Sequence, residues 1–342
     1  MMKYIAVLVI LVLCAVAGAT SVERYNGNET DLAKRWKWAS RSSAAKKGGI
    51  WIGYSIEQKM DENCKIHSHS GWSRNQSLYE LLGTSQPSAH SGLKNIAFIF
   101  RLDNADSTPF EVLEAKFGTF DSNFDFKDLP LYWLHSADEE ESTSWLLKLY
   151  PKQNAEVKED FVAAFGLHRT EASTKMLIKM AKTEAKEIQK DAVFWLGQPG
   201  HEEAFDFLIK TLRSHPEYAV RKAAVFSISQ TESDKAVDIL VEAARSDASH
   251  KIQKEAIFWL GQMAAEKSAQ TLNSIIYDAK TLELKKHAVF SLSQIEDEKA
   301  ENFLIVAAKQ HPNLEVRKSA IFWLGEQGSD KALDVLVGIL KK

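Results

Sequence analysis

The residues best suited to bind a metal lie close together in the N-terminal part of the chain. Cys64, His67 and His69 form the pattern Cys-x-x-His-x-His. Thiolate and imidazole groups are good ligands for zinc or copper at such short spacing. A closed structural zinc site needs a fourth ligand, for which only His90 lies nearby. We therefore interpret this stretch as a polar loop without a metal, and metal binding by these three residues is the alternative.

No catalytic motif is found elsewhere. The sequence contains no Gly-x-Ser-x-Gly, no His-Glu-x-x-His and no Gly-x4-Gly-Lys-Ser/Thr pattern. We expect no enzymatic activity, no catalytic residue and no cofactor. The formal charge of -3 is not typical of a nucleic-acid-binding protein, so nucleic acid is not an expected partner.

Phenylalanine recurs at a fixed interval in the C-terminal part of the chain. Five residues are each separated from the next by 32 positions, namely Phe194, Phe226, Phe258, Phe290 and Phe322. Each repeat contains two amphipathic helical patterns. In the first pattern of one repeat, Val237, Leu240 and Val241 form the apolar face, and the second pattern carries the recurring phenylalanine. A regular interval that holds two helices predicts an α-solenoid.

Two segments carry a resemblance to a known family. The stretch from Val220 to Phe226, followed by the stretch from Ser233 to Ala236, resembles HEAT repeats of the short, phycobilisome-lyase-like type. The resemblance covers residues 142–342, with five clear repeats after a weaker first copy at 160–167. It implies a binding scaffold, and it does not imply lyase activity. Some enzymes with this fold bind two irons through several His-Glu pairs, whereas this chain has only one, at His201.

The repeated phenylalanines fall among polar residues of the second helix. At 100° per residue, Phe194 shares an arc with Lys190 and Gln198. The lysine position recurs as Lys190, Lys222, Lys254, Lys286 and Lys318, and the glutamine position as Gln198, Gln230, Gln262 and Gln294, with Glu326 last. We predict that the phenylalanines and lysines form columns on the concave face that bind a protein or peptide partner. The alternative is that the rings lie half-buried between helices and that the lysines are a solvated face.

Tryptophan follows phenylalanine in every second repeat. Trp195, Trp259 and Trp323 alternate with Ser227 and Ser291 at the same position. Large and small residues that alternate along a stack can interdigitate. We therefore expect these tryptophans to be part of the core.

The first residues have the features of a targeting segment. Lys3 precedes an apolar run from Tyr4 to Val16, and Ala17-Gly18-Ala19 is a cleavage-like sequence. We expect residues 1–19 to be a signal peptide and the protein to be secreted or periplasmic. An uncleaved membrane anchor is the alternative.

Residues 20–140 contain no repeat and are predicted to form a small β-rich unit. We expect strands at 50–56, 93–102, 111–117 and 119–126, and a long polar loop at 61–92. The lead at 20–48 is basic. It is interpreted as a soluble helix or a disordered lead, with contact to a membrane or a partner as the alternative. The acidic run at 138–141 marks the expected boundary, so the solenoid is expected from 142 to 342.

The sequence thus predicts a mainly α protein, a HEAT-type α-solenoid preceded by a small β-rich N-terminal unit. The expected function is an extracytoplasmic scaffold or adaptor that binds a protein partner through its concave face. The alternative is an N-terminal sensor or metal-binding module that the solenoid carries.

Overall fold

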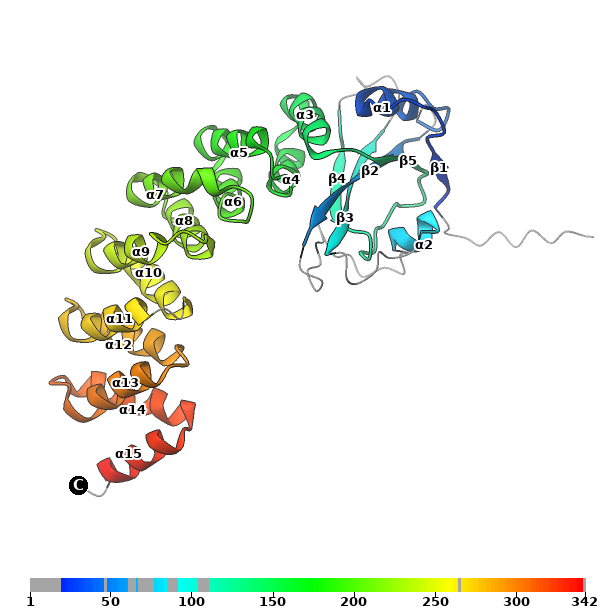
Figure 1. The fold of residues 1–342 in the computed structure, drawn as a ribbon. Helices are drawn as coiled ribbons and strands as arrows, with labels where there is room; N and C mark the ends of the chain where they lie inside the picture. Colours follow the sequence, from blue (N-terminus) through cyan, green and yellow to red (C-terminus); the bar gives the residue numbers. More distant parts are fainter. Residues whose placement is uncertain are drawn as a thin grey trace, which may run out of the picture. The chain divides into compact units, whose positions relative to one another are not determined.

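The computed structural model describes residues 20–45, 48–60, 66, 77–84, 92–103, 111–263 and 266–340. The chain divides into two units, one ending at Gln153 and the other beginning at Asn154 (Figure 1). The expected signal segment at 1–19 lies outside the described residues. Among the residues that are described, no helix is long and apolar enough to span a bilayer.

The N-terminal unit is built on a five-stranded sheet in the order β1-β5-β2-β3-β4. The strands are β1 (Val22–Arg24), β2 (Ile50–Lys59), β3 (Leu93–Leu102), β4 (Glu114–Thr119) and β5 (Leu131–Ser136). The β2–β3 and β3–β4 pairs are antiparallel, whereas β5 is parallel to both β1 and β2. Strands β2 and β3 are rich in β-branched and aromatic residues, which favour extended structure. The predicted β-rich unit is therefore confirmed.

Three of the four predicted strands are present, and the fourth is wrong. The strand expected at 50–56 continues to Lys59, the one at 93–102 has the predicted bounds, and the third is shifted to Glu114–Thr119. After Thr119 the chain turns at once, because the Ser122 N–H donates to the Thr119 carbonyl at 2.8 Å. The segment that follows is irregular in the described structure, and its aromatic rings fill the core.

One face of the sheet is covered by helices α1 (Leu32–Ser40) and α3 (Glu139–Leu149). The Trp36 ring lies 5.4 Å from Phe100 of β3 and 5.3 Å from Trp145 of α3, measured between centroids. The Tyr54 hydroxyl and the Ser142 hydroxyl lie 2.9 Å apart. Burial raises the pKa of Tyr54 far above its usual range, so this phenol stays neutral. The basic lead thus contributes a helix to the core of this unit.

The opposite face of the sheet packs against helix α2 (Leu78–Leu82) and the irregular segment after β4. Successive residues of a strand point to opposite faces, which places Trp51 here and its neighbour Ile52 on the other side. The Trp51 indole N–H donates to the Phe126 carbonyl at 2.8 Å. The buried residues of this layer are Trp51, Leu78, Leu82, Ala97, Ile99, Phe120, Phe124, Phe126, Leu131 and Trp133.

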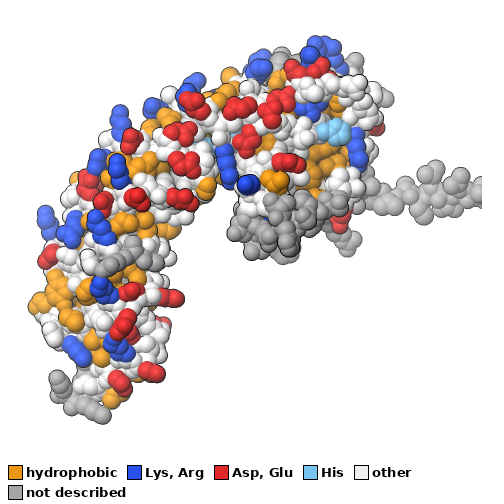
Figure 2. Space-filling model, in the orientation of Figure 1, with side chains coloured by type: hydrophobic (Ala, Val, Ile, Leu, Met, Phe, Trp, Pro, Cys, Tyr) orange, Lys and Arg blue, Asp and Glu red, His pale blue; other side chains and the backbone are white. Residues whose placement is uncertain are grey.

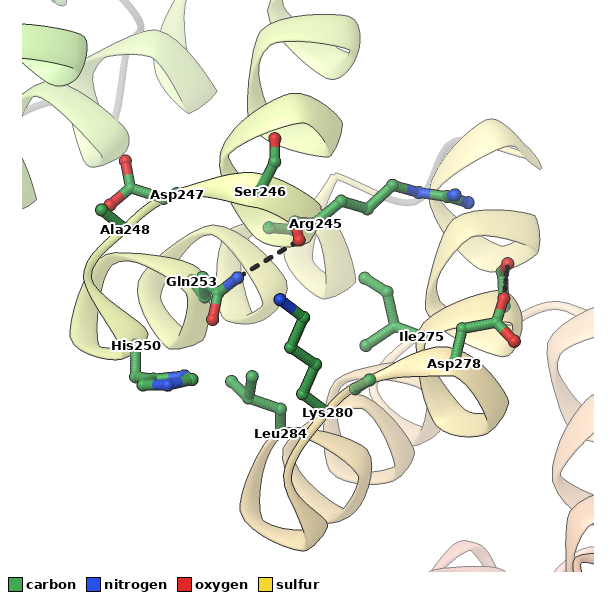
Figure 3. Close-up of a pocket in the computed structure, with 13 residues that line it drawn as sticks. Arg245, Ser246, Asp247, Ala248, His250, Gln253, Ile275, Asp278, Lys280 and Leu284 are labelled. Atoms are coloured by element: carbon green, nitrogen blue, oxygen red, sulfur yellow. Dashed lines mark hydrogen bonds between the residues drawn. The ribbon is translucent and has the colours of Figure 1, made fainter.

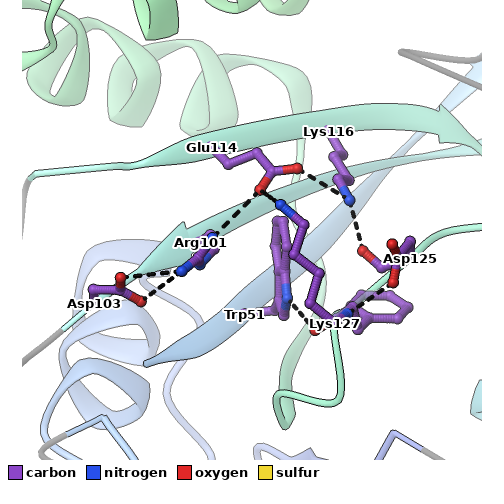
Figure 4. Close-up of polar contacts among 8 residues, drawn as sticks. Trp51, Arg101, Asp103, Glu114, Lys116, Asp125 and Lys127 are labelled. Atoms are coloured by element: carbon purple, nitrogen blue, oxygen red, sulfur yellow. Dashed lines mark hydrogen bonds and ion pairs between the residues drawn. The ribbon is translucent and has the colours of Figure 1, made fainter. Parts of the chain in front are cut away.

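An ion-pair cluster covers this layer at the β3–β4 edge (Figure 4). The Glu114 carboxylate lies 2.7 Å from the Lys127 ammonium, 3.2 Å from Lys116 and 3.7 Å from Arg101. The Lys116 ammonium also lies 4.6 Å from the Trp51 ring centroid, within cation–π range. Burial works to raise the pKa of Glu114, but the lysine contacts outweigh it and the net pKa is lowered.

The C-terminal unit is a stack of helices joined by tight turns (Figure 1). We call the five helices that carry the repeated phenylalanine, together with the equivalent helix of the weaker first copy, the second helices, and we call their partners the first helices. The second helices are α4 (Ala155–Gly166), α6 (Lys186–Trp195), α8 (Tyr218–Gln230), α10 (His250–Gln262), α12 (Leu282–Ser293) and α14 (Leu314–Gln327). The first helices are α5 (Glu171–Thr183), α7 (Phe205–Ser214), α9 (Ala236–Ser246), α11 (Glu266–Asp278), α13 (Glu298–Gln310) and α15 (Asp330–Leu340).

The second helices form the inner layer of this stack. Each packs closely against the next second helix, whereas successive first helices contact one another more sparsely. Closer packing on one side curves the stack toward that side. Figure 1 shows the even-numbered helices on the inner side of the arc within this unit. The solenoid architecture predicted from the sequence is confirmed.

Two buried histidines fix the first turns of the stack. The His168 Nδ1–H donates to the Ala164 carbonyl at 2.7 Å, and His201 Nδ1 lies 2.6 Å from the Thr174 hydroxyl. Both side chains are fully enclosed. Burial lowers the pKa of His168 to about 4 and also lowers that of His201. Both rings are therefore neutral at pH 7.

Candidate partner-binding surface

The five repeated phenylalanines lie one above another along the second helices, and none is enclosed. Phe194 is 37% exposed and Phe322 is 56% exposed. Phe226, Phe258 and Phe290 are half-buried. They occupy the predicted column because each repeat turns the same helix face toward the inner side of the stack.

The phenylalanine rings contact one another directly in pairs. The Phe194 and Phe226 rings are stacked, with centroids 5.4 Å apart and planes 2° apart. Phe258 and Phe290 are also stacked, at 6.4 Å and 18°. The pairing therefore repeats every 64 residues, which is twice the length of one repeat.

The tryptophans connect these pairs. The Trp259 ring lies 4.8 Å from Phe226 in the preceding repeat and 5.2 Å from Phe258 in its own. Trp323 lies in the same way between Phe290, at 4.8 Å, and Phe322, at 4.9 Å. Together with Trp195, which contacts Phe194 at 5.6 Å, these residues form one unbroken series of rings. We call the series the aromatic ladder: Phe194, Trp195, Phe226, Phe258, Trp259, Phe290, Phe322 and Trp323.

The expectation that the tryptophans are core residues is wrong in part. Trp195, Trp259 and Trp323 pack between repeats, yet all three are only half-buried. The core position next to them is filled by small residues. A Cβ atom added to Gly197 would lie 2.5 Å from the Ser227 Cα, and one added to Gly261 would lie 2.5 Å from the Ser291 carbonyl oxygen. The close Gly–Ser contacts therefore bring the helices together. The sequence signal for the tryptophans was present, because each directly follows a phenylalanine of the ladder.

The lysine column lies one helical turn before the phenylalanines and is largely neutralised by acids. Lys222 pairs with Glu255 of the next second helix at 2.8 Å, and Lys254 pairs with Glu283 at 2.6 Å. Lys190 and Lys318 pair within their own helices, with Glu187 at 2.6 Å and Glu315 at 2.9 Å. The fifth lysine, Lys286, is exposed.

Three of the carboxylates in these pairs are ionised near neutral pH. Hydrogen bonds from Lys190, Lys254 and Lys318 lower the pKa values of the Glu187, Glu283 and Glu315 carboxylates. On the face drawn in Figure 2, basic and acidic side chains are interspersed along the helical unit. The lysine column therefore carries little net charge, and it does not by itself favour an anionic partner.

The glutamine row lies one turn after the phenylalanines. Gln230, Gln262 and Gln294 are exposed, and Gln198 is half-buried. The Gln230 amide donates to the Ser229 hydroxyl at 3.0 Å, and the Gln294 amide donates to the Ser293 hydroxyl at 3.2 Å. An amide NH2 has two N–H donors, so each of these bonds uses one of them. The ladder is thus bordered by amide donors on this side.

A cavity of about 400 Å³ lies between the ends of α9 and α11, away from the ladder (Figure 3). In four of the five repeats, the residue five positions before the ladder phenylalanine donates a hydrogen bond to the C-terminal end of the preceding first helix. Arg221 donates to the Leu212 carbonyl at 2.6 Å and Arg317 donates to His311 at 2.7 Å, whereas the shorter Gln253 reaches Arg245 only at 3.3 Å. The Gln253 Oε1 atom is buried without a hydrogen-bond partner.

The predicted metal ligands Cys64, His67 and His69 lie outside the described residues. Within the ranges that the structure does describe, no three His, Cys, Asp or Glu side chains are grouped so that they could hold a metal ion.

Comparison with known proteins agrees with the geometry of the helical unit. A family model of HEAT repeats matches residues 174–260, 205–292 and 277–342. This match confirms the resemblance seen in the sequence. No curated protein sequence matches the chain significantly.

Several solved structures are similar to this chain. Human deoxyhypusine hydroxylase is 14% identical, with 58% of this chain and 85% of that chain covered and a TM-score of 0.30. The CpcE–CpcF complex of phycocyanin lyase from Nostoc is 17% identical, with 56% and 79% covered and a TM-score of 0.35. An engineered protein is 20% identical, with 58% and 61% covered and a TM-score of 0.33.

Proposed function

Because the chain belongs to the HEAT-repeat family, we propose that it is a non-enzymatic scaffold whose aromatic ladder binds a partner protein. The observation that carries the proposal is the unbroken series of partly exposed rings across five repeats. Contiguous apolar surface bordered by polar residues is typical of a protein interaction site. Tryptophan is also enriched among the residues that contribute most to binding energy.

A purely structural role accounts less well for the ladder. If the rings served only to stabilise the stack, they would stabilise it most when fully buried. The stack has already buried a complete apolar layer beneath them, from Ala192 and Val193 in α6 to Ala320 and Leu324 in α14. The exposed rings are an addition to this core, and their exposed area is the feature that a partner can cover.

We also propose that the scaffold acts outside the cytoplasm. The support is the short positive segment, the apolar run and the small-residue sequence within residues 1–19. Mass spectrometry of the mature protein tests this directly, with a new N-terminus at Thr20 as the expected result. A mature chain that begins at Met1 would contradict cleavage.

Site-specific photo-crosslinking in the native cell tests the binding function. A photoreactive phenylalanine analogue replaces Phe226 or Phe290 in one pair of variants and Val306 in the control. Val306 is 43% exposed and lies on the first helix α13, outside the ladder. We expect the same covalent adduct from both ladder positions and none from Val306.

Two results would contradict the proposed function. One is the absence of any adduct at the ladder positions when the protein is folded and present at its natural level. The other is an adduct of equal yield at Val306, since this would indicate random collision rather than a defined surface.

A further inference from the structure

We propose that the cavity between the ends of α9 and α11 binds a guanidinium group (Figure 3). The group belongs either to a small guanidinium compound or to an arginine side chain of a peptide. The cavity of about 400 Å³ has the size of a small-ligand site. It lies away from the aromatic ladder, so this inference goes beyond the proposed function and does not depend on it.

Neighbouring repeats show which chemical group fits at this place. Five positions before the ladder phenylalanine, three of the five repeats carry a basic residue, namely Arg221, Lys285 and Arg317. Each donates to a carbonyl at the end of the preceding first helix, Arg221 at 2.6 Å and Arg317 at 2.7 Å. The carbonyl end of a helix carries partial negative charge, which a cation stabilises. These three repeats therefore supply the cation from their own chain.

The repeat that contains Gln253 does not supply a cation in this way. The glutamine is neutral and shorter than arginine, and its amide reaches the Arg245 carbonyl only at 3.3 Å. Gln253 is 8% exposed, and its Oε1 atom is buried without a hydrogen-bond partner. A buried acceptor that has no donor costs free energy. The cavity thus lies where a donor group is missing, beside the end of a helix.

A carboxylate on the far side of the cavity favours guanidinium in particular. In the preceding repeat, Arg221 bridges the carbonyl end of its own first helix and the Asp247 carboxylate, which directly follows the next first helix. The corresponding groups beside Gln253 are the Arg245 carbonyl and Asp278, the last residue of α11, and both residues line the cavity. Asp278 is exposed and has no basic partner among the described residues. A planar guanidinium with five N–H donors can contact a carbonyl and a carboxylate together, as Arg221 does.

Two basic side chains also line the cavity. In Figure 3 the Arg245 side chain points away from Gln253, whereas Lys280 points into the cavity. Lys280 is exposed, and its ammonium makes no hydrogen bond or ion pair within the part of the chain that the structure describes. Its long side chain is not held in place and regains rotamer freedom when it moves into solvent. We therefore expect Lys280 to compete with the ligand, so that its removal strengthens binding.

Ligand-observed NMR titrations of the full chain test the site. The probes are ethylguanidinium and N-acetyl-arginine amide. The matched control is N-acetyl-citrulline amide, which has nearly the same shape as the arginine compound and is neutral. We expect both guanidinium probes to bind saturably and the citrulline compound to bind at least about tenfold more weakly than the arginine compound.

The two probes also distinguish the sources of the group. If the arginine compound binds at least about threefold more tightly than ethylguanidinium, the site is assigned to a peptide side chain, since the added amides then contribute contacts. If its affinity is equal or weaker, the site is assigned to a small guanidinium compound. Both results support a guanidinium site.

Protein variants locate the probe in the cavity. Gln253→Arg places the protein's own guanidinium there and should weaken the binding of ethylguanidinium at least about tenfold. Gln189→Arg is the matched control, because it adds the same side chain at the equivalent position of another repeat and Gln189 does not line the cavity. It should bind as the wild type does. Asp278→Asn should weaken binding about three- to tenfold, and Lys280→Met should strengthen it about twofold. Circular dichroism confirms that each variant keeps its helical content.

The inference is overturned if neither guanidinium probe binds saturably, or if the citrulline compound binds as tightly as the arginine compound. Unchanged binding in folded Gln253→Arg, or an equal loss in Gln189→Arg, would show that the probe binds elsewhere. Weaker binding by Lys280→Met would show that the cavity selects an anion and would also overturn it. The proposed function is tested separately, by crosslinking at Phe226 and Phe290, and none of these results affects it.

Discussion

Phe226 and Trp259 are 33 residues apart in the chain, and their ring centroids lie 4.8 Å apart in an edge-to-face arrangement. Aromatic pairs at such distances contribute about 0.5–1.5 kcal/mol beyond simple burial. This contact joins two repeats and, through Phe258, continues the ladder into the next pair. The ladder is therefore both an exposed surface and a modest source of cohesion between repeats.

Replacing Trp259 with serine should break the ladder at its centre. Serine already occupies this position at Ser227 and Ser291, so the helix tolerates it. Because Trp259 is half-buried and contacts two rings, we expect a loss of about 1–3 kcal/mol in unfolding free energy. Phe322→Ser should cost less than about 1 kcal/mol, since that ring is 56% exposed. Urea unfolding followed by circular dichroism measures both, and an equal loss in the two variants would contradict this account.

Gly197→Ala should weaken the contact between α6 and α8. The added methyl carbon would lie 2.5 Å from the Ser227 Cα and 2.8 Å from the Ser227 carbonyl oxygen, and neither backbone atom can move alone. We expect a destabilisation of about 1–3 kcal/mol, as is usual for overpacked sites. Gly338 in α15 is the matched control, because a Cβ atom there meets nothing within 4 Å. Gly338→Ala should be neutral or stabilising by up to about 1 kcal/mol. A thermal melt in which both variants behave alike would refute the packing argument.

Gln253→Arg should raise the thermal stability of the helical unit. The longer side chain can fill the neighbouring cavity and donate to the end of α9, as Arg221 and Arg317 do for their own repeats. It would also remove the buried Oε1 atom that has no partner. We expect a gain of about 0.5–1.5 kcal/mol. Gln253→Ala, which loses the bond to the Arg245 carbonyl, should lower stability. The comparison fails if the arginine variant melts at or below the wild-type temperature.

The helical unit should lose stability as the pH falls below neutrality, because burial lowers the pKa of His168 to about 4. An unfolded histidine titrates near 6.5, so between these values the unfolded chain binds more protons than the folded one. The stabilisation from neutral His168 is therefore complete above about pH 6.5 and is lost as the pH falls toward 4. Its full size is about 3 kcal/mol.

The variant His168→Gln isolates this effect, since glutamine keeps an N–H donor for the Ala164 carbonyl and does not titrate. Melting temperatures of the two proteins are compared from pH 7 to pH 4.5. The wild type should lose more stability over this range than the variant. Parallel curves would show that His168 does not contribute to the pH dependence.

Glu114→Gln should weaken the ion-pair cluster at the β3–β4 edge of the N-terminal unit. The pKa of Glu114 is lowered, because its contacts with Lys127 and Lys116 outweigh the opposing effect of burial. Its stabilising contribution is present above the ordinary carboxyl pKa of about 4.5 and is lost as the pH falls through the lowered value. The group is partly solvated, so we expect at most about 1 kcal/mol at pH 7. Glu111→Gln, at an exposed carboxylate, is the control, and a loss of equal size there would argue against a specific role for the cluster.

Much of the helical unit could be predicted from the sequence because stacked repeats convert a regular spacing into neighbouring positions. The 32-residue interval alone places Phe194 beside Phe226, and the helical period of 100° per residue places both on a polar arc. The order of strands in the N-terminal unit could not be predicted in this way. Its parallel β2–β5 pair joins residues about 80 positions apart, and no local pattern records that pairing.

The sequence by itself determined the number of repeats, the phenylalanine column and the lysine and glutamine rows, since each depends only on spacing and helical period. Only the tertiary structure decided how far the rings are exposed, that Trp259 and Trp323 belong to the ladder, and that carboxylates neutralise most of the lysine column. The physical reason is that exposure and ion pairing depend on how closely adjacent helices approach. At Gly197 and Gly261 the close Gly–Ser contacts set that approach.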